Sequence, residues 1–154
     1  MKGNAKLLNW LNKLLSDELT AINQYMVHAE MCGNWGYEKL HENIQKRAIV
    51  EMKHAEKLIE RIIFLEGRPI VSKLNPMHIG AEVPKMMSND LAAEMGAVKG
   101  YNEGIKLAVA VGDNATREAL ESILKDEDGH VDDIEEQRDE IEQMGLPIYL
   151  STKK

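Results

Sequence analysis

The sequence contains a single cysteine, Cys32, among its 154 residues. An intrachain disulfide is therefore excluded, and so are the paired-cysteine metal sites of zinc ribbons and rubredoxins. A reducing cytoplasm is the expected location, because proteins of oxidising compartments commonly carry disulfides. No apolar run approaches the roughly 20 residues that cross a bilayer. The N-terminus reads as an amphipathic helix instead of a signal peptide, so we expect no membrane association.

Positive charge and aromatic residues are also scarce. The chain has 19 Lys and Arg against 26 Asp and Glu, for a net charge of −7. This balance argues against nucleic-acid binding, which needs basic patches. It suits attraction of cations, although ordinary solubility explains it equally well. Aromatic residues make up 5%, and the abundance of Leu, Ala, Glu, Lys and Met favours helix over strand. The length predicts a single domain over residues 1–154.

Helical periodicity appears in four segments of the chain. They cover residues 5–34, 38–66, 83–111 and 114–143. The connections after the first and third segments are short and predict antiparallel hairpins. Residues 67–84 contain three prolines and two glycines, which predicts a long connection that lets the third helix run parallel to the second. We therefore predict an all-α, ferritin-like four-helix bundle with one long crossover connection. Residues 148–154 add a short C-terminal fifth helix.

Several residues mark the ends of these helices. Gly33–Gly36 breaks the first helix, and Gly67 sits where a glycine commonly ends a helix. Asp113 or Asn114 is expected to cap the fourth helix. Gly145 ends that helix.

Polar residues interrupt the apolar stripes, where they are not expected. The residues concerned are Glu18, Glu51, His54, Glu94, Glu127 and His130. Each histidine follows a glutamate by three positions, so both side chains leave the same side of the helix. Every member of the first half maps onto the second half at an offset of 76 positions, as Tyr25 maps onto Tyr101. The two hairpins therefore resemble each other, and packing them together brings the polar residues to one place.

An apolar core does not tolerate four bare carboxylates, because desolvation and mutual repulsion are costly. Two divalent cations neutralise them. Carboxylate and imidazole donors without thiolate favour iron or manganese, and the arrangement matches the di-iron or di-manganese carboxylate bundles. A lone Glu-x-x-His motif is more often a surface salt-bridge element. Two such motifs with matching glutamates indicate a di-metal site.

Other candidates are ordinary by comparison. Tyr25 is either a core tyrosine or a partner of a ligand carboxylate, and Tyr101 reads as a core tyrosine. We expect His28, His41 and His78 to be surface or loop residues. The acidic run over residues 126–136 reads mainly as a solvated helix face.

Longer motifs carry a family resemblance. They are MKGN at the start, LNKLLSDELTAINQY around Glu18, EMKHAEKLIERIIFLEG around Glu51, and VGDNATREALESILKDEDGH before His130. With these motifs the chain resembles the bacterioferritins over essentially its whole length. The resemblance implies a 24-subunit homo-oligomeric shell around an iron mineral, with haem b at two-fold interfaces. Met52 matches the haem axial ligand, although without the resemblance an interface methionine that fills a gap is the better interpretation.

The resemblance also assigns roles within the di-iron centre. Glu51 and Glu127 match the bridging carboxylates, and Glu18 and Glu94 match the terminal ones. One histidine, His54 or His130, binds each iron. The chain departs from many family members on the inner surface, where Lys46 and Val50 replace His and Asp. An inner-surface iron site is therefore not expected from these positions.

The resulting prediction is an iron-storage ferroxidase that oxidises Fe²⁺ with dioxygen or peroxide. Haem is expected to pass electrons during iron release, with a small ferredoxin as a candidate partner. The alternatives are a small iron or manganese peroxidase or catalase, and a metal-free helical structural protein. The second alternative predicts no bound iron and no stabilisation by Fe²⁺.

Overall fold

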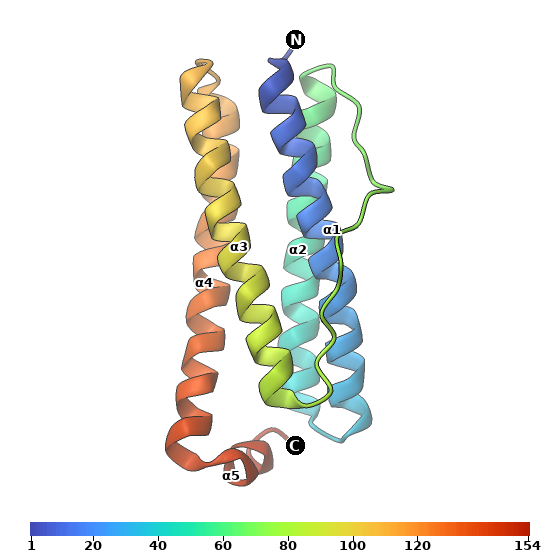
Figure 1. Cartoon of the computed structure of the whole chain (residues 1–154), viewed down its shortest axis with the longest axis vertical. Coiled ribbons are helices and arrows are strands. Elements are labelled where there is room, and N and C mark those ends of the chain that lie inside the picture. Colours follow the sequence, from blue (N-terminus) through green and yellow to red (C-terminus); the bar gives the residue numbers. More distant parts are fainter.

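Four long helices lie side by side, and a fifth short helix packs across one end (Figure 1). The computed structural model describes residues 1–154. The helices are α1 (Ala5–Asn34), α2 (Glu38–Phe64), α3 (Val83–Ala110), α4 (Asn114–Met144) and α5 (Leu146–Ser151). The predicted all-α bundle with a short C-terminal helix is confirmed. None of these helices has both the length and the apolar character that crossing a membrane requires.

The connectivity follows from the lengths of the loops. Short turns make α1 and α2, and likewise α3 and α4, antiparallel neighbours. Residues 65–82 then run the length of the bundle, so that α3 is parallel to α2 (Figure 1). This single crossover confirms the predicted topology.

The apolar core is divided into two clusters along the bundle. One lies near the N-terminus and includes Leu11, Leu58 and Ile123; the other lies near α5 and includes Leu40, Met86 and Ile134. Buried polar residues separate them, since Glu51 lies between Ala48 of one cluster and Ala55 of the other. The functional site therefore sits midway along the helices.

Side chains of α1 hold the crossover segment in place. The crossover has no regular secondary structure, so its backbone N–H groups need other acceptors. Four of these groups donate to polar side chains of α1 at 2.9–3.0 Å: Ile70 to Asn12, Asn75 to Thr20, His78 to Gln24, and Gly80 to His28. The α1 helix thus satisfies the crossover backbone along much of its length.

The prediction that His28 is a surface or loop residue is wrong, because its side chain is fully buried. Its Nε2 accepts the N–H of Gly80, so its Nδ1–H donates to Asp90 at 2.9 Å. A Cβ at Gly80 would collide with the backbone, which explains the glycine at this close approach. His78 is exposed as expected, and His41 is partly buried against the carbonyl of Ala29.

Three helices end in the same hydrogen-bonded turn. In α1, α2 and α3 a residue with positive φ follows the C-cap: Gly36 (83°), Glu66 (61°) and Gly112 (73°). At α2 the left-handed residue is thus Glu66 and not Gly67, which was the glycine expected to end the helix. Gly67 is the next residue, where it donates to the Ile62 carbonyl at 2.9 Å. This pattern is the Schellman motif.

The fourth helix begins at a capped end. Asp113, one of the two predicted caps, accepts the backbone N–H of Thr116 at 3.0 Å. Asn114, the other candidate, is the first residue of the helix. Asp113 also pairs with Arg61 of α2 at 3.1 Å, which ties the two helices together near the N-terminal end of the bundle.

Candidate metal centre

The six predicted polar residues meet between the four long helices. They are Glu18 on α1, Glu51 and His54 on α2, Glu94 on α3, and Glu127 and His130 on α4. The four glutamates and His54 are at most 1% exposed, whereas His130 is 17% exposed. Each helix therefore sends at least one carboxylate into the bundle.

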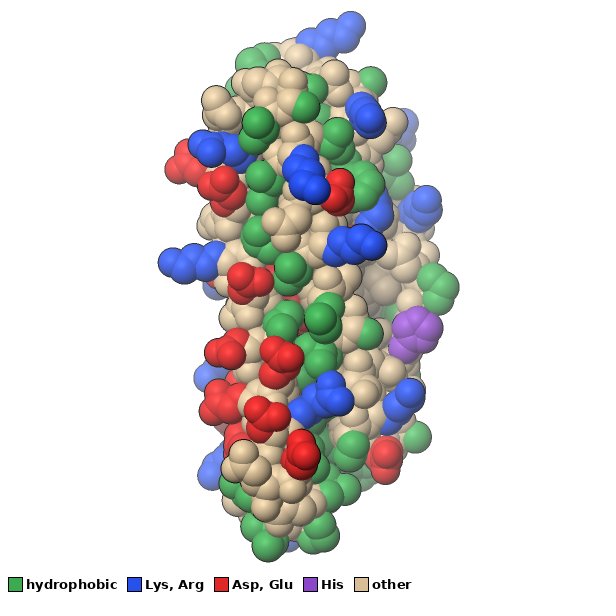
Figure 2. Space-filling view, turned by 60° about the vertical axis from the view of Figure 1, so that its left-hand side comes forward, with side chains coloured by type: hydrophobic (Ala, Val, Ile, Leu, Met, Phe, Trp, Pro, Cys, Tyr) green, Lys and Arg blue, Asp and Glu red, His purple; other side chains and the backbone are tan.

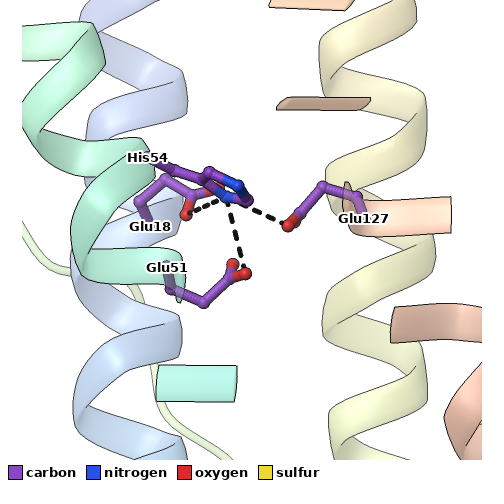
Figure 3. A group of neighbouring side chains, drawn as sticks. All are labelled: Glu18, Glu51, His54 and Glu127. Atoms are coloured by element: carbon purple, nitrogen blue, oxygen red, sulfur yellow. Dashed lines mark ion pairs between the residues drawn. The ribbon is translucent and has the colours of Figure 1, made fainter. Parts of the chain in front are cut away.

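These residues form two overlapping groups of donors. One group is Glu18, Glu51, His54 and Glu127; the other is Glu51, Glu94, Glu127 and His130. Within each group, one donor atom per residue lies within 4.8 Å of the others. Figure 3 shows the first group, with the three carboxylates around one imidazole. Glu51 and Glu127 belong to both groups, and each of them lies close to both histidines.

Each histidine turns Nδ1 toward the carboxylates. Nδ1 of His54 lies 3.2 Å from Glu127 and 3.4 Å from Glu18. Nδ1 of His130 lies 3.1 Å from Glu51 and 3.4 Å from Glu94. Both nitrogens thus face a cluster of negative charge, as ligands of a shared pair of cations do.

Several buried oxygen and nitrogen atoms that could bind a metal ion lack a hydrogen-bond partner. They include one oxygen each of Glu18, Glu51 and Glu94, both oxygens of Glu127, and Nδ1 of His54 and His130. Orphaned buried acceptors are costly, and all of these belong to the two donor groups. Iron and manganese ions bind both carboxylate oxygens and imidazole nitrogens, so two such ions would provide partners for these atoms.

Burial and neighbouring charges shift the pKa values of the site residues. Burial raises the pKa of Glu18 and Glu51 well above the ordinary range, and neighbouring carboxylates add to the effect. Although burial opposes ionisation of Glu127, the close approach of the His130 and His54 imidazoles holds its pKa well below the usual value. Against the effect of burial, the nearby carboxylates of Glu127 and Glu51 raise the pKa of His130 to about 12. The carboxylates and imidazoles of the site therefore influence one another strongly.

Comparison with known proteins places this site in a family. A family profile for the ferritin-like domain matches residues 8–144. A bacterioferritin of Rhodobacter capsulatus is 42% identical over 94% of this chain and 90% of its own length. Bacterioferritins of Brucella melitensis and Streptomyces coelicolor are each 38% identical, over 97% and 99% of this chain and 92% and 91% of their own lengths.

The chain belongs to the bacterioferritin family. As a bacterioferritin-like protein, it carries a buried carboxylate and histidine site suited to two metal ions.

In this bacterioferritin homologue, two tyrosines donate hydrogen bonds to Glu18 and Glu94. We call these two residues the outer glutamates, because each belongs to only one donor group. The hydroxyl of Tyr25 donates to Glu94 at 2.6 Å, and that of Tyr101 donates to Glu18 at 2.9 Å. Burial raises the pKa of both tyrosines well above the ordinary range, so both hydroxyls keep their protons. Tyr101 is buried in the apolar core, as predicted, and its contact with Glu18 is equivalent to that of Tyr25 with Glu94.

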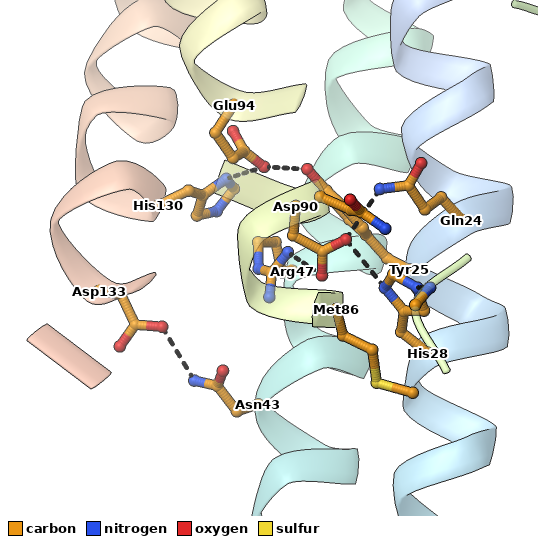
Figure 4. A network of polar contacts seen from close by, with 12 residues as sticks. Gln24, Tyr25, His28, Asn43, Arg47, Met86, Asp90, Glu94, His130 and Asp133 are labelled. Carbon is orange, nitrogen blue, oxygen red and sulfur yellow. Dashed lines mark hydrogen bonds and ion pairs between the residues drawn. The ribbon is translucent and has the colours of Figure 1, made fainter. Parts of the chain in front are cut away.

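A buried polar network continues from Tyr25 toward the crossover (Figure 4). The guanidinium of Arg47 lies 4.4 Å from the ring centroid of Tyr25 and donates to Asp90 at 3.0 Å. Asp90 also accepts hydrogen bonds from Gln24 and His28, both at 2.9 Å. The network links the metal centre to the segment that crosses the bundle.

Asp126 is a site residue that sequence analysis missed. Acidic side chains gather over the lower part of the face on which α4 lies (Figure 2), as expected for a solvated helix face. Asp126 belongs to the acidic run and its side chain is 48% exposed, yet its Oδ2 lies 2.8 Å from Nε2 of His54. This bond orients the imidazole so that Nδ1 faces the carboxylates.

A cavity of about 380 Å³ leads to the metal centre from the side of the bundle where α1 and α3 lie, opposite the contact between Asp126 and His54. Residues of α1, α3 and the crossover line it, including the exposed Lys13 and His78. Buried Glu18, Glu51 and Glu127 also line it. The cavity therefore connects solvent with the donor groups.

Met52 lies on the other side of α2 from the metal centre. It is 46% exposed, whereas the preceding Glu51 is buried. Exposed apolar side chains on α1 and α2 include Met26, Val27 and Ile49. The thioether of Met52 therefore lies on the outer surface of the bundle.

Proposed function

We propose that this protein stores iron and is a ferroxidase that oxidises Fe²⁺ to Fe³⁺ and deposits ferric mineral inside a 24-subunit shell. The observation that carries the proposal is the pair of donor groups that share Glu51 and Glu127. Membership of the bacterioferritin family supports the same conclusion. A cytoplasmic location fits the single buried cysteine.

The charges of the site account for two ions as substrate. Four carboxylates carry four negative charges, which two Fe²⁺ ions neutralise. Glu51 and Glu127 would be shared by the two ions, with Glu18 and His54 at one position and Glu94 and His130 at the other. Each Fe²⁺ gives up one electron, so a pair of ions, with two protons from solvent, reduces dioxygen to hydrogen peroxide, or hydrogen peroxide to two water molecules.

The surrounding residues prepare this chemistry. Tyr25 and Tyr101 hold one oxygen of each outer carboxylate and leave the other free for a cation. The cavity beside α1 and α3 supplies a route from solvent for Fe²⁺, with Asp17 and Glu18 among its lining residues. Because the donors are held by four packed helices, little rearrangement is needed when ions bind.

Met52 is the proposed haem ligand. One methionine from each of two copies would hold haem b at a two-fold interface, and the exposure of Met52 fits this role. Haem, when bound, supplies one-electron transfer, which suits reduction of stored Fe³⁺ by a small ferredoxin during release.

The proposal is tested by rapid mixing of metal-free protein with Fe²⁺ and dioxygen. Glu94→Ala and Glu127→Ala are expected to abolish rapid oxidation, whereas Asp128→Ala, an exposed neighbour on α4, keeps the parental rate. Oxidation at the parental rate in both glutamate variants would contradict the assignment. Rapid disproportionation of hydrogen peroxide by manganese-loaded protein, without ferric mineral, would favour the catalase alternative.

A further inference from the structure

The metal centre has an approximate internal two-fold symmetry that its hydrogen bonds obey. Residues at an offset of 76 positions correspond, so Glu18 corresponds to Glu94 and Tyr25 to Tyr101. Tyr25 bonds Glu94, and Tyr101 bonds Glu18, which is the same contact made in both directions. The two donor groups exchange in the same way.

The symmetry fails at the residue that orients the histidine. Asp126 lies four positions before His130 and bonds Nε2 of His54 on the neighbouring helix. Its counterpart, at the same offset of 76, is Val50, which lies four positions before His54. A valine side chain has no hydrogen-bond acceptor, so the hydrogen bond that Asp126 accepts from Nε2 of His54 has no equivalent at His130.

The surroundings of the two imidazoles differ accordingly. His54 is 1% exposed, and both of its ring nitrogens have carboxylate neighbours. His130 is 17% exposed, its Nδ1 faces the carboxylates, and its Nε2 has no hydrogen-bond partner in the chain. A carboxylate behind a metal-binding histidine fixes the ring and increases its basicity, and its loss commonly weakens metal binding by about 10–100-fold.

We propose that the two metal positions are unequal: the position at His54 holds its ion firmly, and the position at His130 holds its ion loosely because Val50, and not a carboxylate, occupies the position equivalent to Asp126. This inference rests on the proposed di-metal site and adds the order in which its two positions fill. The His54 position fills first, and the ion at His130 exchanges first. Asp126 is thus a positioning residue for one half of the centre.

The test is an anaerobic titration of metal-free protein with Co²⁺, followed by its visible absorption. The wild-type protein is expected to bind two ions per chain in two steps whose dissociation constants differ by about 10–100-fold. Val50→Asp supplies a hydrogen-bond acceptor at this position. It should tighten binding of the second ion and so bring the two dissociation constants closer together. Val50→Leu, an apolar control, leaves the difference unchanged. Asp126→Ala weakens the first step instead.

A second measurement identifies the positions without any variant. Crystals of the wild-type protein with one equivalent of Zn²⁺ per chain should show higher anomalous occupancy beside His54 than beside His130. Equal occupancy, higher occupancy beside His130, or two steps of equal affinity would overturn the inference and leave the di-metal site intact. Failure to bind either ion would instead overturn the proposed function. Circular dichroism establishes that Val50→Asp is folded before its titration is interpreted.

Discussion

The hydroxyl of Tyr25 on α1 donates a 2.6 Å hydrogen bond to the buried carboxylate of Glu94 on α3. This bond joins the two hairpins of the bundle, and the bond from Tyr101 to Glu18 joins them again. Arg47 lies against the ring of Tyr25 and is itself held by Asp90. The outer carboxylates are thus held in place from behind by buried neutral donors, while their inner oxygens face the ion positions.

Removing one of these donors is expected to destabilise the metal-free protein. Tyr25→Phe leaves an oxygen of Glu94 buried without a partner, at a cost of about 1–3 kcal/mol in the free energy of unfolding. Tyr101→Phe is expected to behave alike toward Glu18. Urea denaturation of metal-free protein measures the loss, with Tyr37→Phe as control because the Tyr37 hydroxyl has no hydrogen-bond partner in the structure. Wild-type stability in Tyr25→Phe would show that the bond contributes nothing.

Replacing a buried ligand carboxylate is expected to have the opposite effect. Burial raises the pKa of Glu18, so holding this group ionised at neutral pH costs folded-state stability. Glu18→Gln keeps an acceptor for Tyr101 and removes the charge, which should stabilise metal-free protein by about 1–2 kcal/mol. The same variant should lose most of the stabilisation that Zn²⁺ gives the wild type, about 2.7 kcal/mol at 100 times the dissociation constant. A less stable metal-free Glu18→Gln would contradict the electrostatic account.

Met52 provides a test of haem binding that is independent of iron oxidation. Met52→Leu keeps an apolar side chain of similar volume but removes the sulfur, so the purified protein should lack the haem absorption band. The proposed shell should still assemble, because its subunit contacts are expected to extend beyond one side chain. Met95→Leu replaces a similarly exposed methionine on α3 and should keep the band. Full haem content in Met52→Leu, measured from the visible spectrum of the size-exclusion peak, would point to another ligand.

The end of α2 offers a stabilising substitution. Glu66 adopts φ 61°, where the turns after α1 and α3 use glycine. Glu66→Gly should remove the steric cost of a left-handed side chain and raise the free energy of unfolding by about 1 kcal/mol. Glu66→Ala loses the same exposed pair with the N-terminus but keeps the strained backbone, which makes it the matched control. Equal stability of the two variants in urea would contradict the assignment of strain.

The sequence predicted the features that repeat along the chain. The spacing of Glu18, Glu51, Glu94 and Glu127 within apolar stripes placed these residues in the core, and the length of residues 67–84 predicted the crossover. The burial of His28 was not predictable from periodicity, because the crossover segment that covers it has none. At the end of α2, helix-end rules favoured a glycine, whereas the turn geometry uses Glu66.

Asp126 is a further residue whose role helical periodicity does not predict. Its exposed position within an acidic run resembles a solvated helix face, and its contact with His54 depends on how α2 and α4 pack. The internal repeat contained a usable signal, since Asp126 and Val50 occupy equivalent positions and differ in chemistry. Comparing the two halves residue by residue, beyond the ligands themselves, reveals such differences.

Anomalous diffraction at the iron absorption edge, from crystals soaked anaerobically in Fe²⁺, tests most directly whether cations make the inward-facing glutamates tolerable. The account predicts two iron peaks per chain, both within bonding distance of Glu51 and Glu127, with His54 beside one peak and His130 beside the other. A map with no iron between the four helices, or with iron only on the outer surface, would contradict it.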